Sequence, residues 1–176
     1  MASIGGSFVS KNIEDYYLSP WDLDYAGIIN FDHEFIGRDA LLKLKDQPHR
    51  RKVTLEWNAD DVIGIQASIL HGKENGKFME MPNAHYAAHP YDMVLAGDKL
   101  IGFSTYPAYL SVDHQWISLA TLDESDAQND KEVTVIWGEP GGGSSKPGVE
   151  PHFQKEVRAT VRPWPYSKQA QSYRPK

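Results

Sequence analysis

The stretch "DMVLAGDKLIGFST", residues 92–105, contains two apolar runs separated by Ala96-Gly97-Asp98. Gly97 can adopt a positive φ, which a tight connection between antiparallel strands needs. Two apolar runs flanking such a turn are typical of a β-hairpin. We therefore predict a hairpin here, with partner strands on either side of it in the sequence.

Alternating apolar residues predict those partner strands. Before the hairpin, "RKVTLEW" (51–57) places Val53, Leu55 and Trp57 on one face. After it, further strands are predicted in "WISLATL" (116–122), "KEVTVIWG" (131–138) and "FQKEVRATV" (153–161). Several short strands with turns between them favour a mainly β protein, either a barrel of roughly six strands or a sandwich.

Two short helices are expected beside these strands. Ala40, Leu41 and Leu44 share one face of a helix over about 36–46, which should pack on the β-sheet. On that basis Leu41→Ala is expected to destabilise the protein by about 2–5 kcal/mol. A second helix is predicted in "NADDVIGIQASIL" (58–70), with Asn58 or Asp60 as its cap.

The chain divides into four segments by composition. We expect a flexible N-terminal arm over 1–15, a connecting segment with its helix over 16–48, a C-terminal β-barrel domain over 49–168 and a tail over 169–176. The prolines in "RPWPYSKQAQSYRPK" predict that the end of the chain is extended.

Composition excludes several classes of function. The 176 residues contain no cysteine, which excludes disulfides, thiolate metal sites and cysteine nucleophiles. A net charge of -6 argues against a nucleic-acid partner. Neither a secretory signal nor an apolar run long enough to span a membrane is visible, so we expect a cytoplasmic protein without a membrane partner.

Three short motifs resemble known sites but lack the required context. "GEPGGGSSK" (138–146) has the wrong spacing for a phosphate loop, and a strand follows it. "HYAAH" (85–89) spaces two histidines by four, yet Pro82 and Pro90 bracket the segment, so we predict no metal site. "GFSTY" (102–106) lacks the closing glycine and the helix of a nucleophile elbow.

Aromatic residues are the remaining signal. Tyr16, Tyr17, Trp21 and Tyr25 crowd the start of the connecting segment, and Tyr106 and Tyr109 follow the hairpin. Such rings can stack on a flat heterocycle, although without further context packing in a core or an interface is the better explanation of them. We expect Trp21, Tyr25 and Tyr106 to form an exposed apolar patch that a second copy of the chain or the N-terminal arm covers.

"FIGRDAL" (35–41), "IGFST" (101–105) and "VRATVRPWPY" (157–166) occur in the order found in one enzyme family. Over residues 16–168 the chain resembles the C-terminal region of the glycine-cleavage T-protein (aminomethyltransferase) family. "SPWDL", "FDHEFIGR" and "VTVIWGEPGGGSSKP" resemble its tetrahydrofolate-dependent vanillate/syringate O-demethylase branch, while the long glycine-serine loop departs from ordinary T-proteins. The implied fold is an antiparallel Greek-key barrel.

The resemblance implies transfer of a one-carbon unit to N5 of tetrahydrofolate, with the folate lying between an N-terminal body and this domain. Trp21, His33 and Tyr106 are then the expected cofactor-binding residues. Catalytic residues would lie mainly in the body, so none is assigned here and the isolated chain should be inactive. The implied partner is that body, in the same longer chain or in trans, and a second copy of the chain is a further candidate.

Two other functions remain open. The chain could be a free-standing, non-catalytic barrel that binds a partner chain or a folate-like ligand. It could also assist RNA modification or iron–sulfur assembly, as some folate-binding relatives do, although the acidic balance disfavours this.

Overall fold

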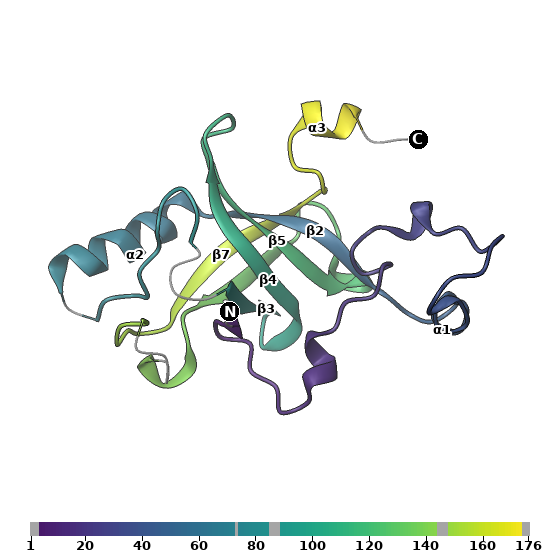
Figure 1. Ribbon diagram of the computed structural model, residues 1–176. Helices are drawn as coiled ribbons and strands as arrows, with labels where there is room; N and C mark the ends of the chain where they lie inside the picture. Colours follow the sequence, from purple (N-terminus) through teal and green to yellow (C-terminus); the bar gives the residue numbers. More distant parts are fainter. Residues whose placement is uncertain (1–3, 73, 85–88, 144–147, 174–176) are drawn as a thin grey trace.

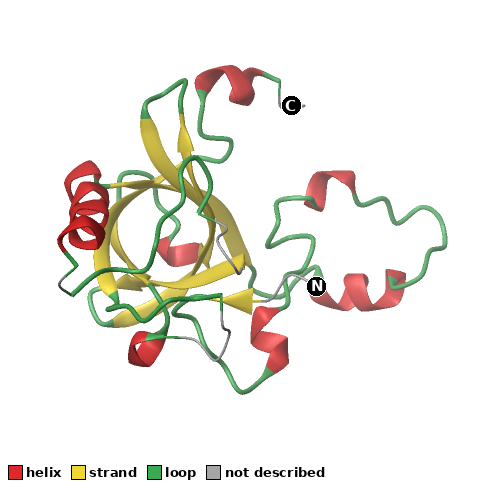
Figure 2. Ribbon diagram, turned by 60° about the vertical axis from the view of Figure 1, so that its left-hand side comes forward, coloured by secondary structure: helices red, strands yellow, loops and turns green. Residues whose placement is uncertain are grey.

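The computed structural model describes residues 4–72, 74–84, 89–143 and 148–173, and a six-stranded antiparallel barrel is its centre (Figures 1 and 2). The barrel strands are β2 (Arg50–Trp57), β3 (His89–Ala96), β4 (Lys99–Leu110), β5 (Gln115–Asp123), β6 (Glu132–Trp137) and β7 (Lys155–Arg162). Their order is β3-β4-β5-β2-β7-β6, and β6 pairs back with β3. The closed sheet confirms the predicted barrel and excludes the sandwich.

The β3–β4 hairpin forms as predicted. Ala96 pairs with Lys99, so Gly97 and Asp98 are the two connecting residues, and Gly97 has a φ of 59°. A two-residue connection with positive φ follows the right-handed twist of the strands that it joins.

Inward-facing side chains of all six strands fill the barrel. Trp57 is central: its ring centroid lies 5.8 Å from that of Trp137 and 6.5 Å from that of Trp116. The indole nitrogen of Trp57 donates to Ser118 Oγ at 2.9 Å, and Ser104 Oγ donates to the same oxygen at 2.7 Å. Ser104, the serine of "GFSTY", is therefore buried in the core, consistent with rejecting a nucleophile elbow there.

The predicted second helix is α2 (Ala59–His71), which lies against the outside of the barrel (Figure 1). Asn58 Oδ1 accepts from the Asp61 amide at 3.1 Å and caps the helix, and Gly72 ends it with a φ of 63°. Val62 and Ile65 are its buried residues. At the other end of the chain the extended tail was a wrong prediction, because Ser167 caps a short helix, α3 (Lys168–Ser172).

The first predicted helix exists as α1 (Arg38–Leu44), but its expected packing is wrong. None of its residues is buried, and Leu44 is 41% exposed. The helix lies in the part of the connecting segment that stands away from the barrel, which we call the extension (Figure 1). The sequence pattern identified an apolar face on the helix but not what packs against it. Leu41→Ala should therefore lower the free energy of unfolding by far less than the 2–5 kcal/mol that is typical of a buried leucine.

The segment before the extension is held on the barrel. β1 (Ile4–Gly5) pairs in parallel with β3, and Gly6 and Ser7 are buried. Residues 4–7 are thus anchored, although the sequence predicted a flexible arm over 1–15. Among the described residues there are also four single turns of 3-10 helix: Ile13–Tyr16, Ala26–Ile28, Glu124–Asp126 and Pro140–Gly142.

A buried ionic cluster holds this anchored segment. Lys77 Nζ lies 2.7 Å from Glu139 Oε1, and both side chains are at most 9% exposed. The Gly6 amide donates to Glu139 at 2.9 Å, and the Ser7 amide donates to Asp92 at 3.1 Å. His152 Nε2 accepts from the Glu139 amide at 2.9 Å. The cluster ties residues from four separate parts of the chain together beneath Gly6 and Ser7.

Asp92 predicts a pH-dependent stability. It is fully buried, and this desolvation raises its pKa from 3.8 to about 7, although Lys77 opposes the shift. Between about pH 4 and 7 the folded state then holds a proton that the unfolded state has lost, so the free energy of unfolding falls as pH rises, by up to roughly 4 kcal/mol. Asp92→Asn should remove this fall, so its stability relative to the parent should increase from pH 4 to pH 8 in urea unfolding.

Asp98→Asn, on the exposed hairpin turn, is the control and should leave in place the fall in the free energy of unfolding that Asp92 causes. Parallel stability–pH curves for Asp92→Asn and the parent would show that Asp92 is ionised in the folded state across this range.

Candidate functional site

An apolar pocket of about 370 Å³ lies between the barrel wall and the N-terminal segment. Side chains alternate across a strand, and Val53 and Leu55 of β2 point into the core, so Lys52 projects outward. Lys52 pairs with Thr121 of β5, and Thr105 of β4 pairs with Leu119 and Tyr91 on this outer face. These residues line the pocket floor, and we call the cavity the Tyr106 pocket.

The N-terminal segment and the connecting segment supply the other walls. Ile4, Leu18 and Leu23 line the pocket from that side. Next to it, Phe8 contacts Tyr16 and Phe103, with ring centroids 5.1 Å and 5.3 Å away. The chain therefore folds back over the outside of its own barrel wall and leaves this cavity beneath it.

Tyr106 stands at an irregularity of β4. The register of β4 against β5 shifts between Thr105 and Ala108, and Tyr106 has a φ of 55°. Such a bulge redirects a side chain out of the regular alternation. The Tyr106 ring is 57% exposed and stacks near His89, with centroids 6.1 Å apart, so both rings present an aromatic surface at the pocket.

The other two predicted cofactor-binding residues lie outside this pocket. Trp21 is half-buried and stacks on His49, with a centroid distance of 5.0 Å and an interplanar angle of 6°. His33 is exposed on the extension, 5.5 Å from the Phe35 ring. The structure thus brings Tyr106 to a cavity but does not bring Trp21 or His33 to the same one.

Asp22 is a key residue that sequence reasoning missed. Its Oδ2 accepts from both the amide and the hydroxyl of Ser19 at 2.8 Å, and its Oδ1 accepts from the Arg50 amide at 2.8 Å. The side chain is nearly buried and fixes the "SPWD" turn to the start of β2. The signal was present, because proline favours a turn and Ser and Asp side chains beside it tend to hydrogen-bond nearby backbone.

The expected apolar patch is partly present. Tyr25 is 45% exposed and Tyr106 57% exposed, whereas Trp21 is covered by His49. Further apolar side chains are exposed along the connecting segment and its helix: Tyr17, Ile28, Ile36, Leu42 and Leu44. A row of exposed apolar residues of this length on one extension is typical of a surface that another protein part covers.

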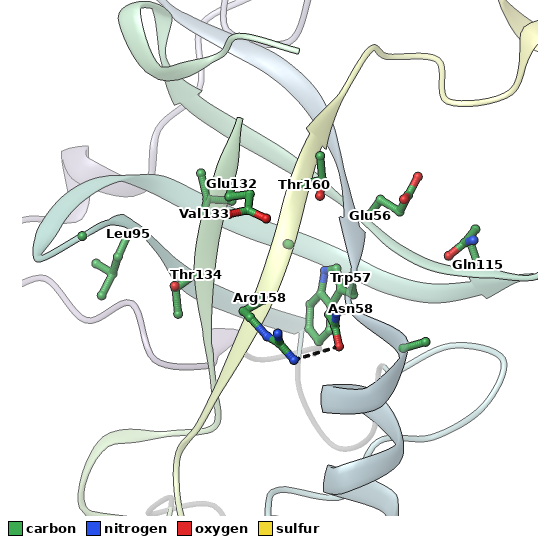
Figure 3. A pocket seen from close by; sticks show the side chains of 13 residues that line it. Glu56, Trp57, Asn58, Leu95, Gln115, Glu132, Val133, Thr134, Arg158 and Thr160 are labelled. Carbon is green, nitrogen blue, oxygen red and sulfur yellow. Dashed lines mark hydrogen bonds between the residues drawn. The ribbon is translucent and has the colours of Figure 1, made fainter. Parts of the chain in front are cut away.

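A second, polar groove crosses β6 and β7 beside the start of α2 (Figure 3). Two of its charged side chains, Arg158 and Glu56, are already paired. Arg158 donates to Asp61 at 2.8 Å and reaches Asn58 Oδ1 at 3.3 Å, and Glu56 accepts from Arg162 at 3.1 Å. These satisfied contacts make the groove a weaker candidate than the Tyr106 pocket.

Several negative findings hold for the described residues only. Among them no group of three or more His, Asp or Glu side chains is arranged to hold a metal ion. In the same part of the chain, no helix combines the length and apolar character needed to cross a membrane. His85 of "HYAAH" and residues 144–147 of the glycine-serine loop lie outside the described residues.

No family model matches the chain, but curated enzymes do, and three of them are described here. It is 46% identical over 165 residues to syringate O-demethylase of Sphingobium sp., covering 94% of this chain and 36% of that enzyme. It is 30% identical over 168 residues to sesamin methylene transferase of Sinomonas sp., covering 90% of this chain and 35% of that enzyme. An aminomethyltransferase of Thermotoga neapolitana is 31% identical over 64 residues, which are 36% of this chain and 18% of that enzyme.

By name, the three relatives are a demethylase, a methylene transferase and an aminomethyltransferase, so each handles a one-carbon group. The chain belongs to the glycine-cleavage T-protein (aminomethyltransferase) family and corresponds to its C-terminal barrel domain. It spans little more than a third of the length of the first two relatives.

Proposed function

We propose that this chain is the C-terminal domain of a tetrahydrofolate-dependent one-carbon transferase of the aromatic O-demethylase type. The observation that carries the proposal is the 46% identity to syringate O-demethylase over 94% of this chain. Because that match covers only 36% of the relative, the remaining catalytic body is the proposed partner. The exposed apolar residues of the extension support this, since they would be buried against such a body.

In this proposal the domain forms one wall of the folate site. Tyr106 and His89 offer a stacking surface at the pocket, which suits a flat heterocycle or a benzoyl ring. Trp21 and His33 are proposed as cofactor contacts made only when the body is present, because neither reaches the Tyr106 pocket. A single wall holds few contacts, so the isolated chain should bind tetrahydrofolate only at about millimolar concentration.

A chimera tests the proposal. The C-terminal third of syringate O-demethylase is replaced by this chain, and tetrahydrofolate-dependent demethylation of syringate is measured. We expect activity in the chimera and a loss of at least about 100-fold in the relative truncated before this domain, because a site assembled between two parts loses its positioning when one is absent. This chain alone should be inactive.

Adding the truncated body in trans provides the second arm and should restore part of the activity. A folded chimera that binds tetrahydrofolate but does not demethylate would contradict the proposed reaction. Tight binding of a folate by the isolated chain, with no effect of the body, would instead favour a free-standing, non-catalytic binding barrel.

A further inference from the structure

One side chain of the N-terminal segment is part of the barrel wall. Strands β3 and β6 are paired as far as Val94 and Val135. The next partners in this antiparallel register would be Met93 and Ile136, but the hydroxyl of Ser7 stands between them. Ser7 Oγ accepts from the Met93 amide at 2.7 Å and donates to the Ile136 carbonyl at 2.6 Å. The Ser7 side chain thus replaces a direct bond between the two strands, at a place that we call the β3–β6 seam.

The residues on either side of Ser7 bind the seam in the manner of an added strand. The amides of Gly6 and Ser7 donate to two buried carboxylates, as described above. The Phe8 amide donates to the Tyr91 carbonyl at 2.8 Å, and the Phe8 ring packs 5.3 Å from that of Phe103. Main-chain hydrogen bonds together with one or two seated side chains are how extended peptides bind the edge of a sheet.

The seam also selects the sequence of the segment. A Cβ atom at Gly6 would lie 2.7 Å from the backbone nitrogen of Tyr91 and closer still to its carbonyl oxygen. Gly6 has a φ of 96°, which residues with a side chain rarely adopt. The fitting sequence is therefore a glycine, then a serine that reaches both strands, then an aromatic residue.

The surface beneath the segment suits a ligand that can leave. Asp92 Oδ2 and Glu139 Oε2 are buried there without a hydrogen-bond partner among the described residues, which is costly while the segment covers them. Residues 4–8 contribute no side chain to the apolar core, and the tether that follows begins at Val9, which is 68% exposed. Undocking therefore uncovers charged groups that water stabilises, at the loss of one aromatic contact.

We propose that the β3–β6 seam is a binding site for an extended Gly-Ser-aromatic peptide. Its occupant in this structure is the chain's own segment, residues 6–8, and the same site takes this segment from a second copy of the chain. The segment is thus a tethered ligand that can undock while the barrel stays folded. Because Ile4, just before it, lines the Tyr106 pocket, undocking also removes one wall of that pocket.

The test uses the full chain carrying Gly6→Ala, whose own segment cannot dock, and a fluorescent peptide of residues 4–11, IGGSFVSK. We expect fluorescence anisotropy to show binding to this variant with a Kd of about 100 µM or below. Binding to the unaltered chain should be about tenfold weaker or more, because the tethered segment competes at a roughly millimolar effective concentration. Gly27→Ala is the matched control and should behave as the unaltered chain, since an added Cβ there has no neighbour within 4 Å.

Two altered peptides test the sequence requirement. Alanine in place of Gly6 or of Ser7 in the peptide should weaken its binding to the Gly6→Ala chain by about tenfold or more, because the first clashes with β3 and the second leaves two strands unbridged. Equal binding by all three peptides would overturn the proposal. So would equal binding of the parent peptide to both chains, or its failure to bind the folded variant at up to about 1 mM.

Hydrogen exchange of the unaltered chain is a second test, which does not depend on how the variant folds. The amides of Gly6, Ser7 and Phe8 should exchange at least about 100-fold faster than those in the middle of β2. Low concentrations of urea should leave these three rates unchanged, because a local opening exposes little new surface. If the three amides exchange only together with β2, the segment leaves the seam only when the whole chain unfolds, and the proposal is wrong.

Discussion

Gly102→Ala is expected to prevent this chain from folding. A Cβ atom at Gly102 would lie 2.1 Å from the carbonyl oxygen of Thr121 and 2.9 Å from the Cα atom of Leu122. Both neighbours are backbone atoms of β5, the strand paired with β4 at this point, so no side-chain movement relieves the clash. Gly102 also has a φ of 153°, which residues with a side chain rarely adopt.

Relief of that clash requires β4 and β5 to separate in the middle of the closed sheet. The cost should exceed about 4 kcal/mol, most of the stability of an ordinary domain of this size. Circular dichroism and urea unfolding should show little or no cooperative transition. Gly64→Ala is the matched control, because an added Cβ at this exposed position of α2 has no neighbour within 4 Å.

Gly64→Ala should raise the free energy of unfolding by up to about 1 kcal/mol, as alanine generally does in place of glycine within a helix. If Gly102→Ala unfolds cooperatively with the stability of the parent, the close approach of β4 and β5 at this glycine is wrong.

From the sequence, Gly102 was identified only as part of the "IGFST" motif. The resemblance marks "IGFST" as part of a family pattern but does not say what lies opposite the glycine. The structure shows that the backbone of the neighbouring strand β5 lies there. A strand pattern reveals which residues alternate, but not which backbone lies opposite a glycine, because the register of β4 on β5 is a long-range property.

The barrel was predictable because its strands carry local signals. Val53, Leu55 and Trp57 alternate in β2, and Gly97 marks the hairpin, so element type and order followed from short windows of sequence. The helix at Arg38–Leu44 was equally visible, but its partner was not. An apolar face on a helix predicts that something packs against it, but not what does. In the described part of the chain no residue of α1 is buried.

The candidate site was predictable only in part. Tyr106 was identified from its aromatic character and its place after the hairpin, and it does reach a pocket. Lys52 was not identified, because a lysine at an outward position of a strand is usually solvated. The placement of Trp164 over the Lys52 ammonium joins positions more than 100 residues apart, and no local pattern encodes that contact.

The buried cluster beneath the N-terminal segment was also invisible in the sequence. Its members lie far apart in the chain, and nothing in the sequence around any of them indicates burial: Lys77, Asp92, Glu139 and His152. They are buried together because residues 4–7 close over them. Burial of charges is costly unless they are paired, so the cluster should be sensitive to the loss of any one member.

Lys77→Met is the variant that should show this sensitivity most clearly. Removing the ammonium leaves Glu139 buried without its partner at 2.7 Å and also removes the charge that opposes protonation of Asp92. Leaving one charge of a buried pair unmatched typically costs 3–5 kcal/mol, so the midpoint of urea unfolding should fall sharply. The Ile4–Ser7 segment should also lose protection from hydrogen exchange, because the Gly6 amide donates to the same carboxylate.

The double variant Lys77→Met with Glu139→Gln tests whether the lost stability comes from the unpaired charge of Glu139 or from the altered packing at position 77. Glutamine keeps an oxygen that can accept from the Gly6 amide but carries no charge, so the second substitution should recover much of the stability lost in the first.

Lys99→Met is the exposed control. Lys99 is 62% exposed and pairs with Asp126 at 3.0 Å, and such surface pairs contribute little to stability because solvent screens them. Equal losses for Lys77→Met and Lys99→Met, or no recovery in the double variant, would mean that the Lys77–Glu139 pair is hydrated rather than buried.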